Sequence, residues 1–147
     1  MNVAGEFNVP IGTKSTVVLP NDNFRAVAEV LHRAMLHCSD FEPILNLARR
    51  NDFVFVDPPY TVVHNLNGFV KYNDRLFSWP DQIRLHAAVR RACDRGAKVL
   101  VLNANHESLR SLYRAFPQQT IPRQSILAAN PRSRKAVEEL AITCWER

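Results

Sequence analysis

Glycine is scarce in this sequence. Only Gly5, Gly12, Gly68 and Gly96 occur among the 147 residues, and no two of them form a Gly-x-Gly pair. A Gly-x-Gly turn lets the backbone approach a phosphate or cofactor closely, because glycine has no Cβ atom and adopts positive φ at low cost. The sequence therefore contains no glycine loop of that kind.

Cysteines and long apolar runs are also few. The three cysteines, Cys38, Cys93 and Cys144, are scattered and form no Cys-x-x-Cys pair. This pattern argues against a framework of disulfides and predicts reduced thiols in a cytoplasm. No apolar run is long enough to span a bilayer, so we expect neither a signal peptide nor a membrane span.

The composition is that of a globular protein, with 46% hydrophobic and 22% charged residues. The length corresponds to one domain or part of one. The formal net charge is +5 and the sequence pI about 9.5. Such a charge suits a polyanionic partner, although a basic protein without such a partner fits it equally well.

The stretch around which the chain is organised is residues 52–60, DFVFVDPPY. Residues 53–56 are continuously apolar, which predicts a strand buried on both faces. Asp57-Pro58-Pro59-Tyr60 then ends the strand in a stiff extended turn, because each proline restrains the residue before it. The turn holds a carboxylate, free carbonyls and an aromatic ring at a strand's carboxyl end, where α/β sheets bind ligands. A core strand closed by a proline-rich turn is the simpler alternative.

A second buried strand is predicted at residues 98–102. The helix before it is capped by Ser78 and ended by Gly96, and its arginines are expected to form a solvated face. Two apolar strands joined by a helix predict a βαβ crossover and a parallel sheet. Residues 120–128 and 139–145 are predicted to pair as a final hairpin. The solvated arginines are Arg84, Arg90, Arg91 and Arg95.

Upstream of the central stretch, apolar residues at helical spacing predict a helix from Phe24 to about Arg33. A short strand is predicted at residues 34–37. Asp40 or Ser39 then caps a second short helix.

Asp57-Pro58-Pro59-Tyr60 resembles motif IV of the amino methyltransferases, the signature of enzymes that methylate the exocyclic amine of adenine in DNA. The resemblance implies that the Asp57 carboxylate and a carbonyl of the proline pair accept the two amine hydrogens. Tyr60 would stack on an adenine turned out of the duplex. The implied methyl donor is S-adenosylmethionine, and no metal is implied.

Two further segments carry the same resemblance. Residues 2–14 resemble the target-recognition region of Dam-type DNA adenine methyltransferases, in which a hairpin lies against the DNA. The matching positions imply DNA contacts at Asn2, Asn8, Pro10 and Lys14. Asp40-Phe41 resembles motif III of the family, which lies beside the adenine of the methyl donor. That similarity gives Asp40, Phe41 and Asp57 as cofactor contacts, while capping is the alternative role of Asp40.

The carboxyl-terminal part, from Arg123 through Arg132 and Arg134 to Glu139-Leu140, resembles the end of the Dam-type enzymes. We expect Arg123, Arg132 and Arg134 to contact DNA, the alternative for the basic residues 130–135 being a solvated turn.

The resemblance covers only the second half of the family's pattern. The first half, with a Lys-bearing segment and a Phe-x-Gly-x-Gly loop, has no counterpart among these 147 residues. The expected fold is α/β, a Rossmann-like S-adenosylmethionine-dependent methyltransferase fold that is incomplete, with a parallel sheet ending in an antiparallel hairpin. Residues 1–20 would be a remnant of the target-recognition hairpin, and residues 21–147 the carboxyl-terminal part of the catalytic domain.

The function implied is that of a site-specific DNA adenine methyltransferase, of the kind found in restriction-modification, in a fragmentary, truncated or split form. Its partner would be double-stranded DNA, with a second chain or self-association covering the exposed edge of residues 53–56. Two alternatives stay open: an inactive DNA-binding remnant, and a methyltransferase that acts on another planar amine.

Overall fold

The computed structural model describes residues 18, 20–62, 76–124 and 136–145. The chain forms two compact units, residues 1–38 and residues 39–147, and each is described by itself. The expected functional division after residue 20 stays a prediction.

The first unit contains helix α1, Phe24–Leu31. Asn23 caps it, with its side-chain oxygen accepting a 3.0 Å hydrogen bond from the Ala26 amide. Arg25 and Glu29 form an exposed i,i+4 ion pair. The strand predicted at residues 34–37 is wrong, since these residues form a bend and irregular backbone. A strand needs a neighbour for its hydrogen bonds, and none of the described strands pairs with this segment.

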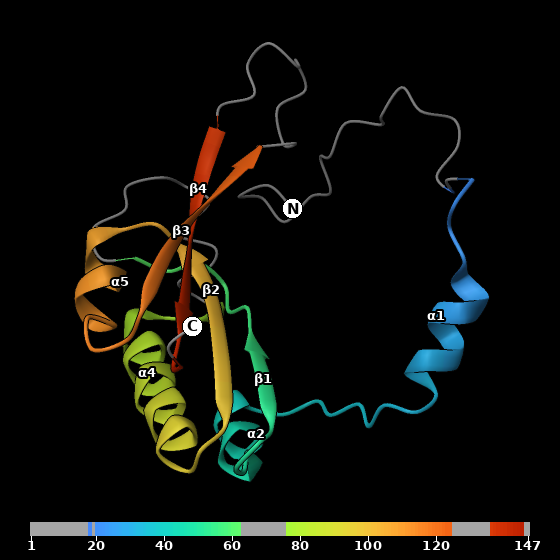
Figure 1. Ribbon diagram of the computed structural model, residues 1–147, viewed down its shortest axis with the longest axis horizontal. Helices are drawn as coiled ribbons and strands as arrows, with labels where there is room; N and C mark the ends of the chain where they lie inside the picture. Colours follow the sequence, from blue (N-terminus) through green and yellow to red (C-terminus); the bar gives the residue numbers. More distant parts are fainter. Residues whose placement is uncertain (1–17, 19, 63–75, 125–135, 146–147) are drawn as a thin grey trace. The chain divides into compact units, whose positions relative to one another are not determined.

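The second unit contains three helices and a four-stranded sheet (Figure 1). Strand β1 (Phe53–Val56) lies parallel to β2 (Lys98–Ala104), and helix α4 (Trp79–Asp94) connects them. The predicted βαβ crossover is therefore confirmed. The sheet order is β1-β2-β4-β3. Strands β3 (Gln118–Gln124) and β4 (Ala136–Thr143) pair antiparallel, as predicted for the final hairpin, and β4 is also antiparallel to β2.

Local capping sets the ends of the helices. Ser78 and Asp81 form a reciprocal capping box at the start of α4. Gly96 follows that helix with a φ of 87°, a conformation that glycine adopts without steric cost. Helix α2 (Phe41–Leu47) is capped by Asp40, and helix α5 (Glu107–Leu112) by His106. The ends at Ser78, Gly96 and Asp40 lie where the sequence predicts them.

The core lies between the sheet and its helices. Val99 and Val101 of β2 and Ile142 of β4 point toward α4 and are almost fully buried, as is Leu109 of α5. Figure 1 shows α4 and α5 on the same side of the sheet, and α2 packs against α4. All three helices of this unit thus contribute to one apolar core.

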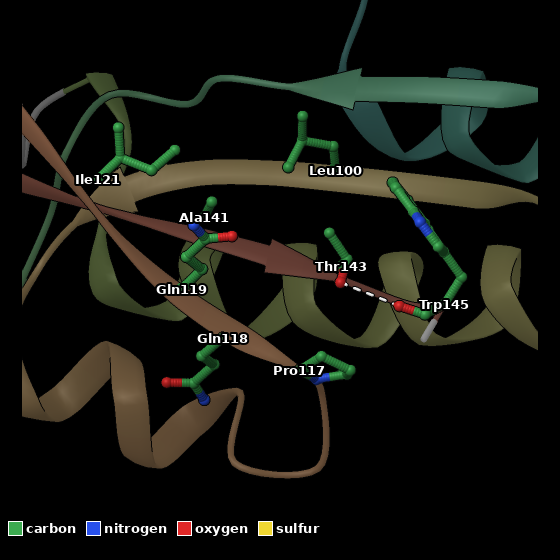
Figure 2. A pocket seen from close by; sticks show the side chains of 8 residues that line it. All are labelled: Leu100, Pro117, Gln118, Gln119, Ile121, Ala141, Thr143 and Trp145. Atoms are coloured by element: carbon green, nitrogen blue, oxygen red, sulfur yellow. Dashed lines mark hydrogen bonds between the residues drawn. The ribbon is translucent and has the colours of Figure 1, made fainter. Parts of the chain in front are cut away.

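The opposite face of the sheet is largely uncovered by the described residues. Phe53 is 62% exposed and Phe55 54% exposed, so the prediction that β1 is buried on both faces is wrong. Alternation explains the difference: Val54 and Val56 face the core, while Phe53 and Phe55 face away from it. This open face carries a groove of about 580 Å³ beside Leu100, Ile121 and Trp145 (Figure 2).

Candidate active site

The Asp57-Pro58-Pro59-Tyr60 turn follows β1 directly, at the carboxyl edge of the sheet (Figure 1). Asp57 and Pro59 are exposed, and Pro58 and Tyr60 are half-buried. The last residues of the parallel neighbour β2 lie at the same edge. Strand β3 ends and β4 begins there too, because β4 is antiparallel to β2. Three chain segments therefore meet at one edge, as expected of an α/β ligand site.

A buried hydrogen bond connects this turn to the start of α4. Thr61, the residue after Tyr60, is fully buried, and its hydroxyl donates a 2.6 Å hydrogen bond to the carbonyl oxygen of Phe77. The ring of Phe77 in turn contacts the ring of Phe41, with 5.8 Å between the centroids. Phe77 therefore contacts both segments: its carbonyl binds the segment that follows Asp57, and its ring contacts the segment that begins at Asp40. No local sequence pattern singles out Thr61, because its partner lies 16 residues further along the chain.

Both oxygens of the Asp40 carboxylate accept hydrogen bonds within the protein. Its Oδ1 atom accepts hydrogen bonds from the Glu42 amide (2.8 Å) and from Arg84 Nη1 (2.9 Å), and its Oδ2 atom accepts from Arg84 Nη2 (2.9 Å). The hydrogen bonds from Arg84, and secondarily the Glu42 amide, hold the pKa of Asp40 below its usual value. Asp40 is thus a helix cap and an ion-pair partner.

Arg84 is the centre of this cluster. Its guanidinium lies 4.3 Å from the centroid of the Phe41 ring and also binds Glu42 (3.3 Å) and Asp81 (3.1 Å). These carboxylates, Asp40 first among them, raise the pKa of Arg84 above its ordinary value. Arg91 and Arg95 are exposed, as predicted for a solvated face, and Arg84 is half-buried. The prediction did not include their contacts, because all three also bind α2 or its cap.

A second buried polar group lies at the end of β2. The Asn103 amide donates a 3.2 Å hydrogen bond to Gln82 Oε1, and the Gln82 amide donates a 3.3 Å hydrogen bond to the Tyr113 hydroxyl. All three side chains are fully buried. Burial raises the pKa of Tyr113, although the hydrogen bond from Gln82 acts in the opposite direction. This network fixes α4 and α5 relative to the strand that neighbours β1.

The remaining predicted site residues are the DNA contacts. Asn2, Asn8, Pro10, Lys14, Arg132 and Arg134 lie outside the described residues. Arg123 lies in β3, where it pairs in register with Val137 of β4, near the edge that carries Asp57.

The arrangement suits the recognition of a planar polar group. An exposed carboxylate, proline carbonyls and a half-buried aromatic ring are grouped on one turn, with a second aromatic segment linked through Phe77. In the described part of the chain, no three His, Cys, Asp or Glu side chains cluster as metal ligands would. No helix in that part is long and apolar enough to cross a membrane.

The fold is α/β, and the turn after β1 resembles motif IV of the amino methyltransferases. The chain belongs to the family of D12 class N6 adenine-specific DNA methyltransferases, whose model matches residues 1–127. The resemblance drawn from the sequence is thereby confirmed.

Curated relatives agree with this family. The chain is 37% identical over 112 residues to a "DNA N-6-adenine-methyltransferase" of Escherichia phage P1. This match covers 76% of this chain and 15% of that protein. It is 30% identical over 145 residues to "Type II methyltransferase M.MjaIII" of Methanocaldococcus jannaschii, covering 97% of this chain and 50% of that protein. It is 31% identical over 148 residues to "Retron Ec67 DNA adenine methylase" of Escherichia coli, and the match covers 98% of this chain and 50% of that protein. The chain thus spans about half the length of these last two relatives.

Proposed function

We propose that this chain supplies the target-adenine side of a DNA adenine methyltransferase that uses S-adenosylmethionine. The observation that supports this most directly is the Asp-Pro-Pro-Tyr turn at the carboxyl end of β1, in a chain that belongs to the D12 family. The relatives described above are named as adenine methyltransferases or methylases, or as a type II methyltransferase. A Rossmann-like arrangement of the complete enzyme is part of the proposal.

The proposed chemistry assigns each turn residue a task. The exocyclic amine of adenine is a poor nucleophile because its lone pair is delocalised into the ring. The exposed Asp57 carboxylate and a carbonyl of Pro58 or Pro59 would accept the two amine hydrogens and stabilise positive charge that develops on nitrogen. Tyr60 would stack on the turned-out base, an interaction worth about 1–3 kcal/mol. When bound, S-adenosylmethionine supplies an electrophilic methyl group.

The cofactor would lie between this turn and the α2 segment. Phe41 is half-buried and offers an aromatic surface for a purine, and Asp57 offers a negative charge for a cationic ligand. These residues fit one side of such a pocket. The glycine loop that the family uses on the other side has no counterpart among the 147 residues. We propose that activity requires this missing segment, in the same polypeptide or from another chain.

The open face of the sheet supports the need for a completing segment. Parallel strands are normally covered on both faces, whereas Phe53 and Phe55 are more than half exposed. Within the described sheet β1 is also an edge strand, and an unpaired edge favours association with another chain. A segment equivalent to the other half of the relatives would cover the exposed face of the sheet and the edge of β1. Alternatively, a second copy of this chain would cover them.

Double-stranded DNA would bind at the carboxyl edge of the sheet. Strand β3 ends and β4 begins at this edge, and the sequence between them contains Arg132 and Arg134. With Arg123, Lys14 and the net charge of +5, these residues would contact phosphates, while Asn2, Asn8 and Pro10 would belong to the recognition hairpin. The proposal includes a cytoplasmic site of action, where the thiols stay reduced. Binding without methylation, or another planar amine as substrate, are the competing outcomes.

The test is methyl transfer from labelled S-adenosylmethionine to duplex DNA. The 147-residue chain should be inactive alone and active when mixed with the half of M.MjaIII that it does not match. In the active mixture, Asp57→Ala should abolish methylation while DNA affinity, measured by fluorescence anisotropy, changes less than about twofold, because phosphate contacts dominate affinity. Equal loss of DNA binding and turnover would make Asp57 structural. Robust turnover by the chain alone would refute the need for a completing segment.

A further inference from the structure

Helix α2 buries little apolar surface. It has only seven residues, which is too short for a stable isolated helix. Leu45 is its one buried residue, while Ile44 is 41% exposed and Leu47 66% exposed. Yet this helix begins with Phe41, the aromatic ring proposed to face the cofactor. Its position must therefore come largely from other contacts.

Two arginines of α4, Arg84 and Arg91, and its C-cap residue Arg95 supply those contacts along the whole length of α2. Arg84 binds the cap Asp40 through two parallel hydrogen bonds of 2.9 Å. Arg91 binds Glu42 in the first turn and lies 3.5 Å from the Asn46 side-chain oxygen. Spacings of seven and four residues put Arg84, Arg91 and Arg95 on one face of α4.

The last arginine acts at the opposite end of α2. Arg95 Nε donates to the carbonyl oxygen of Ala48 (2.8 Å), and its Nη2 donates to that of Leu45 (2.7 Å). Carbonyls at a helix end have no partner within the helix, and a cation there is favourable. The two ends of α2 are thus held by guanidinium groups 11 positions apart on one rigid helix.

We propose that Arg84, Arg91 and Arg95 are positioning residues that fix the Phe41 ring at the cofactor side of the site. The inference deepens the proposed function and rests on it. It also gives Asp40 a second role: both carboxylate oxygens accept donors from the protein, so Asp40 helps to position Phe41 through Arg84. Arg84 is central, because it joins Asp40 while its guanidinium stacks on Phe41 at 4.3 Å.

The test measures binding of S-adenosylhomocysteine to the isotopically labelled chain by NMR. In the unsubstituted chain, the ligand should shift the resonances of the Phe41 ring and of the α2 amides. The affinity should be weak, because the chain supplies only one side of the proposed pocket. Arg84→Met should weaken binding about five- to tenfold and speed hydrogen exchange of the α2 amides. Arg84→Lys should recover only part of the affinity, because an ammonium group cannot form the bidentate contact. Added salt should weaken binding more in the unsubstituted chain than in Arg84→Met.

Two control variants separate positioning from general effects. Arg90→Met removes the same charge from the same helix, at an exposed residue that makes no ion pair among the described residues, and should leave affinity unchanged. Ile142→Val removes a buried methyl group from β4, and should lower the melting temperature without changing affinity.

Each alternative outcome has a definite meaning. If Ile142→Val weakens binding as much as Arg84→Met does, general destabilisation explains the loss and the positioning role is refuted. If Arg84→Met binds as the unsubstituted chain does, the positioning role fails while the proposed function stands. If the ligand leaves Phe41 unshifted in the unsubstituted chain, the cofactor assignment of this segment fails, and the inference fails with it.

Discussion

The hydroxyl of Thr61 donates a 2.6 Å hydrogen bond to the carbonyl oxygen of Phe77, 16 residues further along the chain. Thr61 directly follows the Asp-Pro-Pro-Tyr turn, and Phe77 directly precedes the cap of α4. This bond therefore closes the loop between the turn and the helix. Because the Phe77 ring also contacts Phe41, one buried bond links the two sequence motifs of the candidate site.

Replacing Thr61 should reveal the strength of this link. Thr61→Val keeps the shape of the side chain and removes the hydroxyl, which leaves the Phe77 carbonyl without its buried donor. The free energy of unfolding should fall by about 1–3 kcal/mol, measured by urea denaturation. Thr61→Ser retains the hydroxyl and should lose less. If Thr61→Val is as stable as the unsubstituted chain, the hydrogen bond contributes nothing.

Acidification should destabilise the protein through His86. Partial burial, with its ring against Tyr113 and Phe116, and secondarily the charge of Arg90 lower the pKa of His86 below its usual value of about 6.5. The unfolded chain then binds more protons than the folded one as the pH falls below 6.5, so this contribution to stability is present at higher pH and is lost toward pH 5. The melting temperature should decrease between pH 7 and pH 5.

Substitution of His86 isolates this effect. His86→Phe removes the titrating group and preserves an aromatic ring beside Tyr113 and Phe116, so the decrease between pH 7 and pH 5 should become smaller. The exposed His32→Gln is the control and should behave as the unsubstituted chain does. The lowered pKa values of Asp40 and Asp81 affect stability only below about pH 5, where the carboxylates of the unfolded chain begin to bind protons and those of the folded chain do not. An unchanged decrease in His86→Phe would exclude His86 as its cause.

The open sheet face should make the isolated chain self-associate. Phe55 projects from this face, and Phe53 packs its ring edge against Trp145 there. Phe55→Gln should reduce the mass measured by light scattering at high protein concentration, since it removes exposed apolar area. Ile83→Gln, at an exposed position on α4, is the matched control. A monomeric unsubstituted chain, or an equal effect of Ile83→Gln, would contradict this prediction.

The basic segment between β3 and β4 should contribute to DNA affinity without sequence preference. Arg134→Glu should weaken binding to all duplexes and flatten the dependence of affinity on salt by about one unit of slope or more, because a phosphate contact is lost. Fluorescence anisotropy at several salt concentrations measures this slope. A slope that does not change would remove Arg134 from the interface.

The sequence was sufficient where neighbouring residues determine the structure. Asp40, Ser78 and His106 begin helices because each cap bonds to a backbone amide two or three residues away. Two apolar runs around a helix of 16 residues predicted the parallel pair β1 and β2, since a crossover of that length returns the chain in the same direction. The turn after β1 follows from the backbone restraint of two prolines.

Only the tertiary structure decided which surfaces and distant residues meet. Arg84 reaches Asp40 across 44 positions, and Thr61 reaches Phe77 across a long connection, so neither pair has a local pattern. Likewise, the apolar run Phe53–Val56 predicts a strand, but it does not determine whether other elements bury one face of that strand or both. Hydrophobicity and capping act over a few residues, whereas ion pairs between elements depend on the path of the whole chain. For that reason the sequence determined the strand, the turn and the family, and the structure revealed the arginines that hold α2.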